Sequence, residues 1–220
     1  MDKKKYDVHE RLEFGLALAA VAGGLDAYTF LAHGEVFAGL QTGNFILLGI
    51  HLGQANWSIL INHLIPILAF FLGVLIARQL QKKISKNQQL WFLLFETVLL
   101  LFVGVFSSFL PNLLANALLS IAAAMQLQVF AKLKGKPFTS LMMTGNLRHL
   151  ATYFFEAYIN HDTTKKIAFK DTLFILVSFA FGALLNGFFV TYLGQATILL
   201  SLIFLGMAIF LLVKDKQAFL

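Results

Sequence analysis

The side chains of this chain that are able to do chemistry lie inside long apolar stretches. Asp26 lies within the apolar stretch Leu12–Leu31, and Glu96 lies near the start of the stretch Leu90–Phe109. A charged side chain at the centre of a bilayer costs about 2.5–3.5 kcal/mol on insertion scales, so such residues face a cavity or a partner. For Asp26 we expect a substrate contact or a carried proton, with a structural cap or a pair with Asn44 as the alternative. For Glu96 the alternatives are a proton relay and a side chain that reaches the membrane interface.

The tripeptide Thr-Gly-Asn occurs twice, at residues 42–44 and 144–146, near the starts of the apolar stretches Val36–Leu52 and Phe138–Tyr158. Thr and Asn favour helix starts, and Gly permits a turn. We therefore expect each stretch to enter the membrane as irregular backbone, turn at the tripeptide and return as a helix. Both helix N-termini would then point at the bilayer midplane, where their partial positive charge favours an anion or a dipolar group.

These two helix starts predict a solute site between them. Gln126 holds the place in its apolar stretch that Asp26 holds in the first, and it either contacts a ligand or bridges two helices. Arg148 follows the second tripeptide by two residues, so it lies near the midplane or, if the dip is shallow, reaches water. Asp26 and Glu96 are the candidates for proton coupling. The predicted substrate-binding residues are Asp26, Gln41, Thr42, Gly43, Asn44, Gln126, Thr144, Gly145, Asn146 and Arg148.

Composition places these residues in a membrane protein. The chain has 220 residues, of which 59% are hydrophobic and 13% are charged, and its mean hydropathy is +0.78. Apolar runs of about 20 residues match a hydrocarbon core about 30 Å thick. The first run lacks a small-residue cleavage site, so we interpret it as a retained helix and not as a signal peptide. The predicted spans are Leu12–Leu31, Ser58–Ala77, Leu90–Phe109, Leu113–Ala131, Thr172–Val190 and Gln195–Val213.

Lysine and arginine predict the orientation of these spans. They cluster before the first span, after the second, between the fourth and fifth, and after the sixth, whereas residues 32–57, 107–112 and 191–196 contain none. The positive-inside rule then places both termini in the cytoplasm. It also requires that the two tripeptide stretches dip into the membrane and return, which is tolerated only where protein or water covers the backbone. The net charge of +6 suits a membrane surface better than nucleic acid.

The predicted order of elements repeats along the chain. Each half has one span, one dip and two spans, over about 12–110 and 112–214. Three spans per half invert the second copy relative to the first. We therefore expect a single transmembrane domain over residues 1–220. Its fold class is an all-α integral membrane protein with six transmembrane helices plus two re-entrant half-helices, in two inverted-topology repeats of three spans.

Four segments carry a resemblance to a known family: Gly24–Ala27, Gln41–Asn44, Ala124–Gln126 and Thr144–Asn146. Together they resemble the YoaK-type family of uncharacterised bacterial inner-membrane proteins, a domain-of-unknown-function family, over nearly the whole chain. Family members often have Gln-Asn where this chain has Gln-Leu at positions 126 and 127. The resemblance implies a multi-pass protein of the bacterial cytoplasmic membrane and supplies no established substrate.

These observations predict a small-solute transporter, with an anionic or a proton-coupled substrate, in which one half rocks against the other. A channel-like pore and a non-transporting membrane scaffold or sensor are the alternatives. An intramembrane enzyme is the weakest alternative, because no recognisable catalytic set occurs, and we expect no enzymatic activity. The chain has no cysteine, and the spacing of His33, His51 and His63 matches no metal-ligand set. We expect no metal or cofactor, a small solute or ion and the lipid bilayer as partners, and no nucleic acid, and a homo-oligomer stays open.

Overall fold

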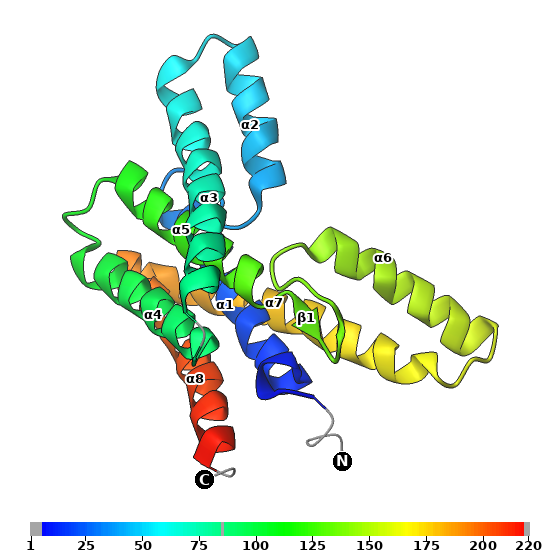
Figure 1. Ribbon diagram of the computed structural model, residues 1–220. Coiled ribbons are helices and arrows are strands. Elements are labelled where there is room, and N and C mark those ends of the chain that lie inside the picture. The colour runs from blue at the N-terminus through cyan, green and yellow to red at the C-terminus, as the bar shows by residue number, and fades with distance from the viewer. Residues whose placement is uncertain (1–5, 85, 218–220) are drawn as a thin grey trace.

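The computed structural model of the chain is a set of long helices joined by short connections, with one pair of two-residue strands (Figure 1). The structure describes residues 6–84 and 86–217, so the basic residues 3–5 of the N-terminus lie outside the described residues. Five helical segments are long and apolar enough to cross a membrane. The chain is therefore an integral membrane protein with an all-helical membrane domain.

The chain order gives two series of four helices. A short 3-10 helix, η1 (Val8–Glu10), precedes the first series. The first series consists of α1 (Leu12–Ala32), α2 (Gln41–Gly53), α3 (Trp57–Lys83) and α4 (Gln88–Phe106). The second series consists of α5 (Asn112–Val129), the strands β1 (Lys132–Leu133) and β2 (Lys136–Pro137), α6 (Met143–Phe154), a π-helical turn η2 (Phe155–Ile159), α7 (Lys165–Leu193), the 3-10 helix η3 (Gly194–Leu200) and α8 (Ser201–Gln217).

The predicted fifth and sixth spans are not separated by a loop in the structure. They belong to one run of 51 residues, Lys165–Asp215, in which η3 links α7 to α8. The chain changes direction at Gly194, whose φ of 53° suits glycine. No proline or charged residue occurs between Leu193 and Ser201, so the linker stays helical. The number of membrane crossings remains a prediction.

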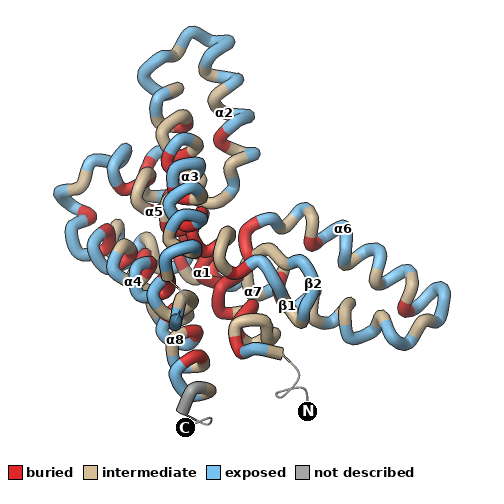
Figure 2. The backbone as a smooth tube through the Cα atoms, viewed as in Figure 1, coloured by how far each residue is buried: buried red, intermediate tan, exposed pale blue. Residues whose placement is uncertain are grey.

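Helix α1 lies at the centre of the molecule. Within its most apolar stretch 78% of the residues are buried, against 22% for α3. Small residues allow this, because a Cβ atom on Gly23 would overlap the carbonyl oxygen of Phe179, and one on Gly182 would overlap that of Ala20. The backbones of α1 and α7 therefore touch, as is typical of small residues at membrane helix crossings. Figure 2 shows that buried residues concentrate around α1, while the outer parts of the α2–α3 and α6–α7 hairpins are exposed.

The packing partners of the two series correspond. Helix α1 packs most extensively on α7, and α5 packs most extensively on α3. Helix α2 packs on α3 as α6 packs on α7, and α8 packs on α1 as α4 packs on α5. Figure 1 shows the α2–α3 and α6–α7 hairpins projecting from a shared centre in different directions. Arg11, just before α1, and Asp215 of α8 form an ion pair at 3.1 Å, so the start of α1 and the end of α8 lie at the same end of the molecule.

The expectation that the chain turns at the two tripeptides is wrong. Helix α2 begins at Gln41 and α6 begins at Met143, so both tripeptides lie inside the first helical turns. Neither Gly43 nor Gly145 has a positive φ. The turn precedes the tripeptide, because a side chain on α1 binds the backbone of Gly39 and Leu40 and bends the chain there.

Candidate functional site

Asp26 of α1 organises the segment that leads into α2. Its Oδ1 atom accepts a hydrogen bond from Gly39 N at 2.6 Å and one from Leu40 N at 3.2 Å. One turn further along α1, Thr29 Oγ1 accepts a bond from Ala38 N at 3.1 Å. Helix α1 ends at Ala32, six residues after Asp26. The segment after α1 therefore returns alongside the helix to the level of Asp26, a distance of about 9 Å at 1.5 Å per residue. Asp26 Oδ2 is buried and has no hydrogen-bond partner among the described residues.

The asparagine of the first tripeptide closes this segment into a loop. Asn44 is fully buried, and its side chain bonds the backbone of Phe37 twice, accepting from N at 3.0 Å and donating to O at 2.7 Å. Its Nδ2 also donates to Gln41 Oε1 at 2.9 Å, and Gln41 Nε2 donates to Ala38 O at 2.8 Å. Gly43 lies against the Phe37 ring, where a Cβ atom would approach to 2.8 Å. The polar atoms of Asn44 are therefore used in holding the loop.

The second tripeptide repeats this arrangement with fewer bonds. Asn146 Nδ2 donates to Thr139 O at 3.0 Å, seven residues back, as Asn44 bonds Phe37 seven residues back. Gln126 takes the place of Asp26, and its Nε2 donates to Ser140 Oγ at 2.7 Å and to Leu18 O at 3.1 Å. Gln126 therefore bridges α5 to α1 as well as to the loop, and its Oε1 is buried without a hydrogen-bond partner.

The two loops meet where α2 and α6 begin. A Cβ atom on Gly39 would overlap the side chain of Leu141, and Leu141 is itself buried. The starts of the two helices are thus neighbours, as expected, but the helices then diverge (Figure 1). Thr42 and Thr144 are exposed on separate hairpins, and Gly145 has open space around it. The structure brings together the loops and their binding partners, and it does not bring the two threonines together.

The two remaining charged candidates lie apart from these loops. Glu96 is only 2% exposed and its Oε1 has no hydrogen-bond partner, so the alternative that it reaches the membrane interface is wrong. Arg148 is exposed on α6 and forms no ion pair within the described residues. It does not pair with Asp26 there. Among residues 6–84 and 86–217, no group of three His, Asp or Glu side chains is placed to hold a metal ion.

A polar cluster lies on the other side of α1. A Cβ atom on Gly24 would lie 2.5 Å from Ser201 Oγ and 2.8 Å from Asn186 Nδ2. Ser201 Oγ and Asn186 Oδ1 are both buried without hydrogen-bond partners. The sequence carries one signal for this cluster, since Gly24 lies two residues before Asp26. Ser140 had a signal as well, because it lies six residues before Asn146 as Ala38 lies before Asn44.

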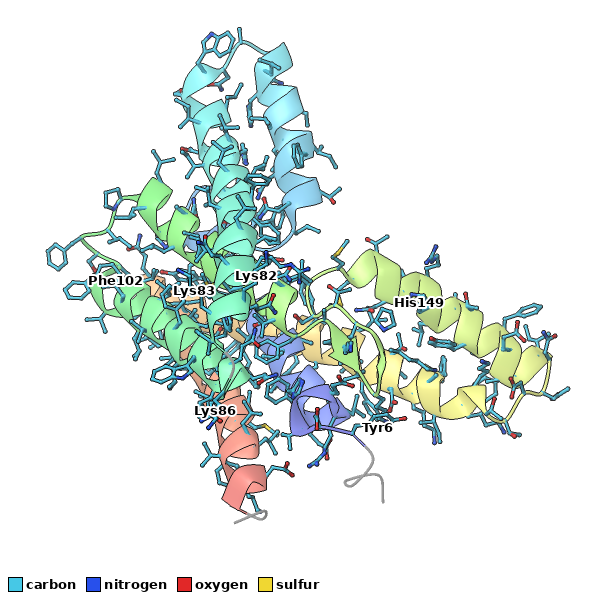
Figure 3. The ribbon with its side chains drawn as sticks, in the orientation of Figure 1. Tyr6, Lys82, Lys83, Lys86, Phe102 and His149 are labelled. Atoms are coloured by element: carbon cyan, nitrogen blue, oxygen red, sulfur yellow. The ribbon has the colours of Figure 1, made fainter. Side chains whose placement is uncertain are left out.

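A cavity of about 440 Å³ opens between the β1–β2 connection and the α6–α7 hairpin. Asn146, His149 and Tyr153 of α6 line it on one side, and Figure 3 shows His149 on the side of α6 that faces α7. Lys134 and Asp171 also line it and form an ion pair at 2.6 Å. The cavity therefore reaches the first turn of α6 and carries both charged and aromatic groups.

A buried hydrogen-bond network joins the ends of three segments opposite this cavity. Tyr28 donates its hydroxyl hydrogen to Gln195 O at 2.7 Å, and His33 Nε2 lies 2.9 Å from that hydroxyl. His33 Nδ1 lies 2.9 Å from Asn112 Oδ1, and Asn116 donates to His33 O at 2.9 Å. His33 follows the last residue of α1, and burial lowers the pKa of its ring, although the Asn112 contact opposes this. Histidine is here a buried bridge between α1, α5 and η3.

Comparison with known proteins identifies the family. A family model described as "Protein of unknown function (DUF1275)" matches residues 14–211. The UPF0700 transmembrane protein YoaK of Bacillus subtilis (strain 168) is 30% identical over 145 residues. That match covers 60% of this chain and 62% of YoaK, so it spans less than two thirds of the relative's length. No solved structure matches the chain. Because the family model covers most of its residues, as the resemblance implied, the chain belongs to the DUF1275 family of proteins of unknown function.

Proposed function

We propose that the chain is a membrane transporter for a small solute, whose site lies where the loops before α2 and α6 meet. One observation carries the proposal. Two helices begin inside the molecule after non-helical segments, and Asp26 Oδ2 and Gln126 Oε1 are buried beside those segments without hydrogen-bond partners in the described part of the chain. Interrupted helices with free polar groups at membrane depth are typical of transporter sites. A buried ionisable side chain in a membrane segment is likewise a functional feature by default.

The packing supports an inverted repeat around this site. When α1 is matched to α5 and α3 is matched to α7, the α1–α7 contact becomes the α5–α3 contact and the reverse. The matched bonds of Asn44 to Phe37 and of Asn146 to Thr139 place equivalent loops in both halves. On this proposal six crossings form two inverted repeats, with α2 and α6 as re-entrant helices. Rocking of one half against the other then opens the site to each side in turn.

Charge suggests the class of solute and the coupling. The N-termini of α2 and α6 carry partial positive charge, and the exposed Arg148 adds a full one. These groups favour an anionic solute such as a carboxylate, while the buried carboxyls of Asp26 and Glu96 suit proton coupling. The cavity that reaches Asn146 serves as a vestibule on the side of the basic loops. The proposal assigns no enzymatic activity.

On this proposal the vestibule and both termini lie on the cytoplasmic side of a bacterial cytoplasmic membrane, as the distribution of lysine and arginine predicts. Cysteine accessibility on the cysteine-free chain tests this orientation. Single cysteines replacing Glu35 and Gln54, which are both exposed, should react from the same side with a reagent that cannot cross membranes. Labelling from opposite sides would mean that α2 crosses the membrane, and the six-crossing proposal would be wrong.

Transport is tested with the purified chain in liposomes that contain a pH-sensitive dye. A panel of monocarboxylates, dicarboxylates, inorganic phosphate and neutral amino acids is added outside, one at a time. We expect at least one carboxylate to drive proton entry, and we expect Asp26→Asn to abolish proton entry while exchange of the radiolabelled carboxylate continues. Asp26→Asn keeps an oxygen acceptor for Gly39 N and Leu40 N, so the loop stays held. Flux equal to that of protein-free liposomes for the whole panel would refute the proposal.

A channel is separated from a transporter by counterflow in the same liposomes. Unlabelled solute inside should accelerate entry of labelled solute through a transporter, because each reorientation carries one solute. A pore open to both sides shows no such acceleration.

A further inference from the structure

A groove of apolar side chains separates the end of α3 from the start of α4. Its volume is about 350 Å³. Leu80 of α3 and Ile84, which follows the last residue of α3, line one wall, and Trp91, Phe95 and Val98 of α4 line the other. The α4 residues are spaced three to four apart, so they form one stripe about 10 Å long at 1.5 Å per residue. Consecutive helices in a hairpin usually pack on each other. Here α3 and α4 make no extensive contact and each packs on α5 instead.

No other described part of the chain covers this groove. Trp91 is 58% exposed and Val98 is 60% exposed. Polar atoms contribute almost nothing to the groove lining. Its occupant must therefore be apolar and elongated, which describes a hydrocarbon chain.

Three lysines surround the end of the groove that carries Trp91. Lys82 and Lys83 end α3, Lys86 follows in the connection to α4, and all three are exposed. Figure 3 shows them around the junction of α3 with α4. None of the three forms an ion pair within the described residues. The chain has no Asp or Glu between Glu35 and Glu96, so the cluster has no acidic neighbour in its own segment and suits an anion from outside.

The order of these groups matches the order of groups in a phospholipid. Tryptophan favours the headgroup level of a membrane, so Trp91 places the lysines at the polar surface and Val98 deeper in the hydrocarbon. Lysine binds phosphate as a point charge, and clusters of lysine beside a membrane segment attract anionic lipids. We propose that this groove is a binding site for one anionic phospholipid, with an acyl chain between α3 and α4 and the phosphate at Lys82, Lys83 and Lys86.

The lipid would fill the space between α3 and α4, which do not pack extensively on each other. Its headgroup would offset the repulsion among the three lysines, and its acyl chain would fill the space in front of α5. This inference is independent of the proposed transport activity, because it rests on a surface remote from the Asp26 loop.

Native mass spectrometry of the purified full chain tests the proposal. The protein in neutral detergent is mixed with phosphatidylglycerol or phosphatidylcholine of identical acyl chains, and the retained lipid and the thermal midpoint are measured. The charge variant is K82Q/K83Q/K86Q. The matched control is K165Q/K166Q/K170Q, which removes the same charge from the start of α7. We expect wild type and control to retain phosphatidylglycerol about fivefold or more over phosphatidylcholine, and the charge variant to lose this preference.

A second variant, Val98→Trp, fills the groove and leaves the lysines in place. It should reduce retention of both lipids, because the tryptophan side chain would occupy the space of the acyl chain. The site is refuted if the charge variant binds phosphatidylglycerol like wild type, or if both lysine variants lose it equally. It is also refuted if a cysteine at Val98 cross-links efficiently to Val98 of a second copy in liposomes, since a protein interface would then cover the groove.

Discussion

The α2–α3 and α6–α7 hairpins share a backbone plan and differ in chemistry. In both, a short helix begins at the centre, and an asparagine in its first turn bonds the backbone seven residues back. The outward face of α2 then carries Ile46 and Ile50, whereas the equivalent face of α6 carries Arg148 and Thr152. The asparagine therefore maintains the loop in both hairpins. The outward face differs, because its apolar residues on α2 suit contact with lipid, whereas its polar residues on α6 suit contact with water or an anion.

The two loops are also anchored differently. The loop before α2 is held by α1 itself, through Asp26 and Thr29. The longer segment before α6 contains β1 and β2 and is held from outside, because Lys134 N donates to Glu10 O at 2.7 Å and Gly135 N donates to a Glu10 carboxylate oxygen at 3.0 Å. The first loop is therefore held from the core, whereas the second is held both by Gln126 in the core and by Glu10 outside it.

Substitutions at the two glycines where the hairpins cross the core should destabilise the fold most. Gly182→Ala should destabilise the fold by at least about 3 kcal/mol, because the new Cβ atom would meet the backbone of α1, which cannot yield. Gly73→Ala should cost less, about 1–3 kcal/mol, because its new contacts, Ala124 Cβ at 2.8 Å and the Ile121 backbone at 3.0 Å, overlap less than the contact of Gly182 with the Ala20 carbonyl oxygen. Thermal midpoints in detergent measure both.

The control for these glycines is Gly187→Ala. Nothing lies within 4 Å of a Cβ atom there, and alanine favours a helix over glycine by about 0.5–1 kcal/mol. Equal losses of stability for Gly73→Ala and Gly182→Ala would contradict the prediction, because they would show that the two helix crossings are equally tight.

The next effect concerns the asparagines. Asn44→Ala should cost about 2–3 kcal/mol, because it removes three hydrogen bonds and leaves buried groups of Phe37 without partners. Asn146→Ala should cost about 1 kcal/mol, since Asn146 makes one backbone bond and a sulfur contact at 3.6 Å to Met143. Asn160→Ala, which removes only an exposed bond, is the control. A greater loss at position 146 would contradict the order of loop strengths.

The smallest effect is a pH dependence confined to the first loop. Burial lowers the pKa of His33, so the folded state disfavours the protonated ring. His33 therefore stabilises the fold above its unfolded pKa of about 6.5, and this contribution is lost as the pH falls below that value, by up to about 1.4 kcal/mol per pH unit. Relative to the intrinsic rate, hydrogen exchange of residues 34–40 should increase as the pH falls from 6.5 to 5.5, while that of residues 132–138 should stay constant. His33→Gln should remove the difference, and a persistent difference in that variant would assign it to another group.

Much of the candidate site could be predicted from residue types. An aspartate in an apolar stretch and two copies of one tripeptide were enough to identify the segments that return to the core. Gln126 bonds the segment before α6, and Asp26 bonds the segment before α2. The position of the turn could not be predicted. It depends on Asp26 Oδ1 reaching the backbone of residues 39 and 40, and a hydrogen bond between residues 13 apart leaves no local pattern in sequence.

Residue composition alone establishes that the chain lies in a membrane, because hydrocarbon admits only long apolar helices and excludes most charges. Sequence motifs also identified the family and the paired loops. The three-dimensional contacts were needed to show that α1 is central, that Gly24 meets Asn186 and Ser201, and that α2 and α6 diverge after starting side by side. These are contacts between segments distant in the chain, and each is set by close packing of backbones that composition and spacing do not encode.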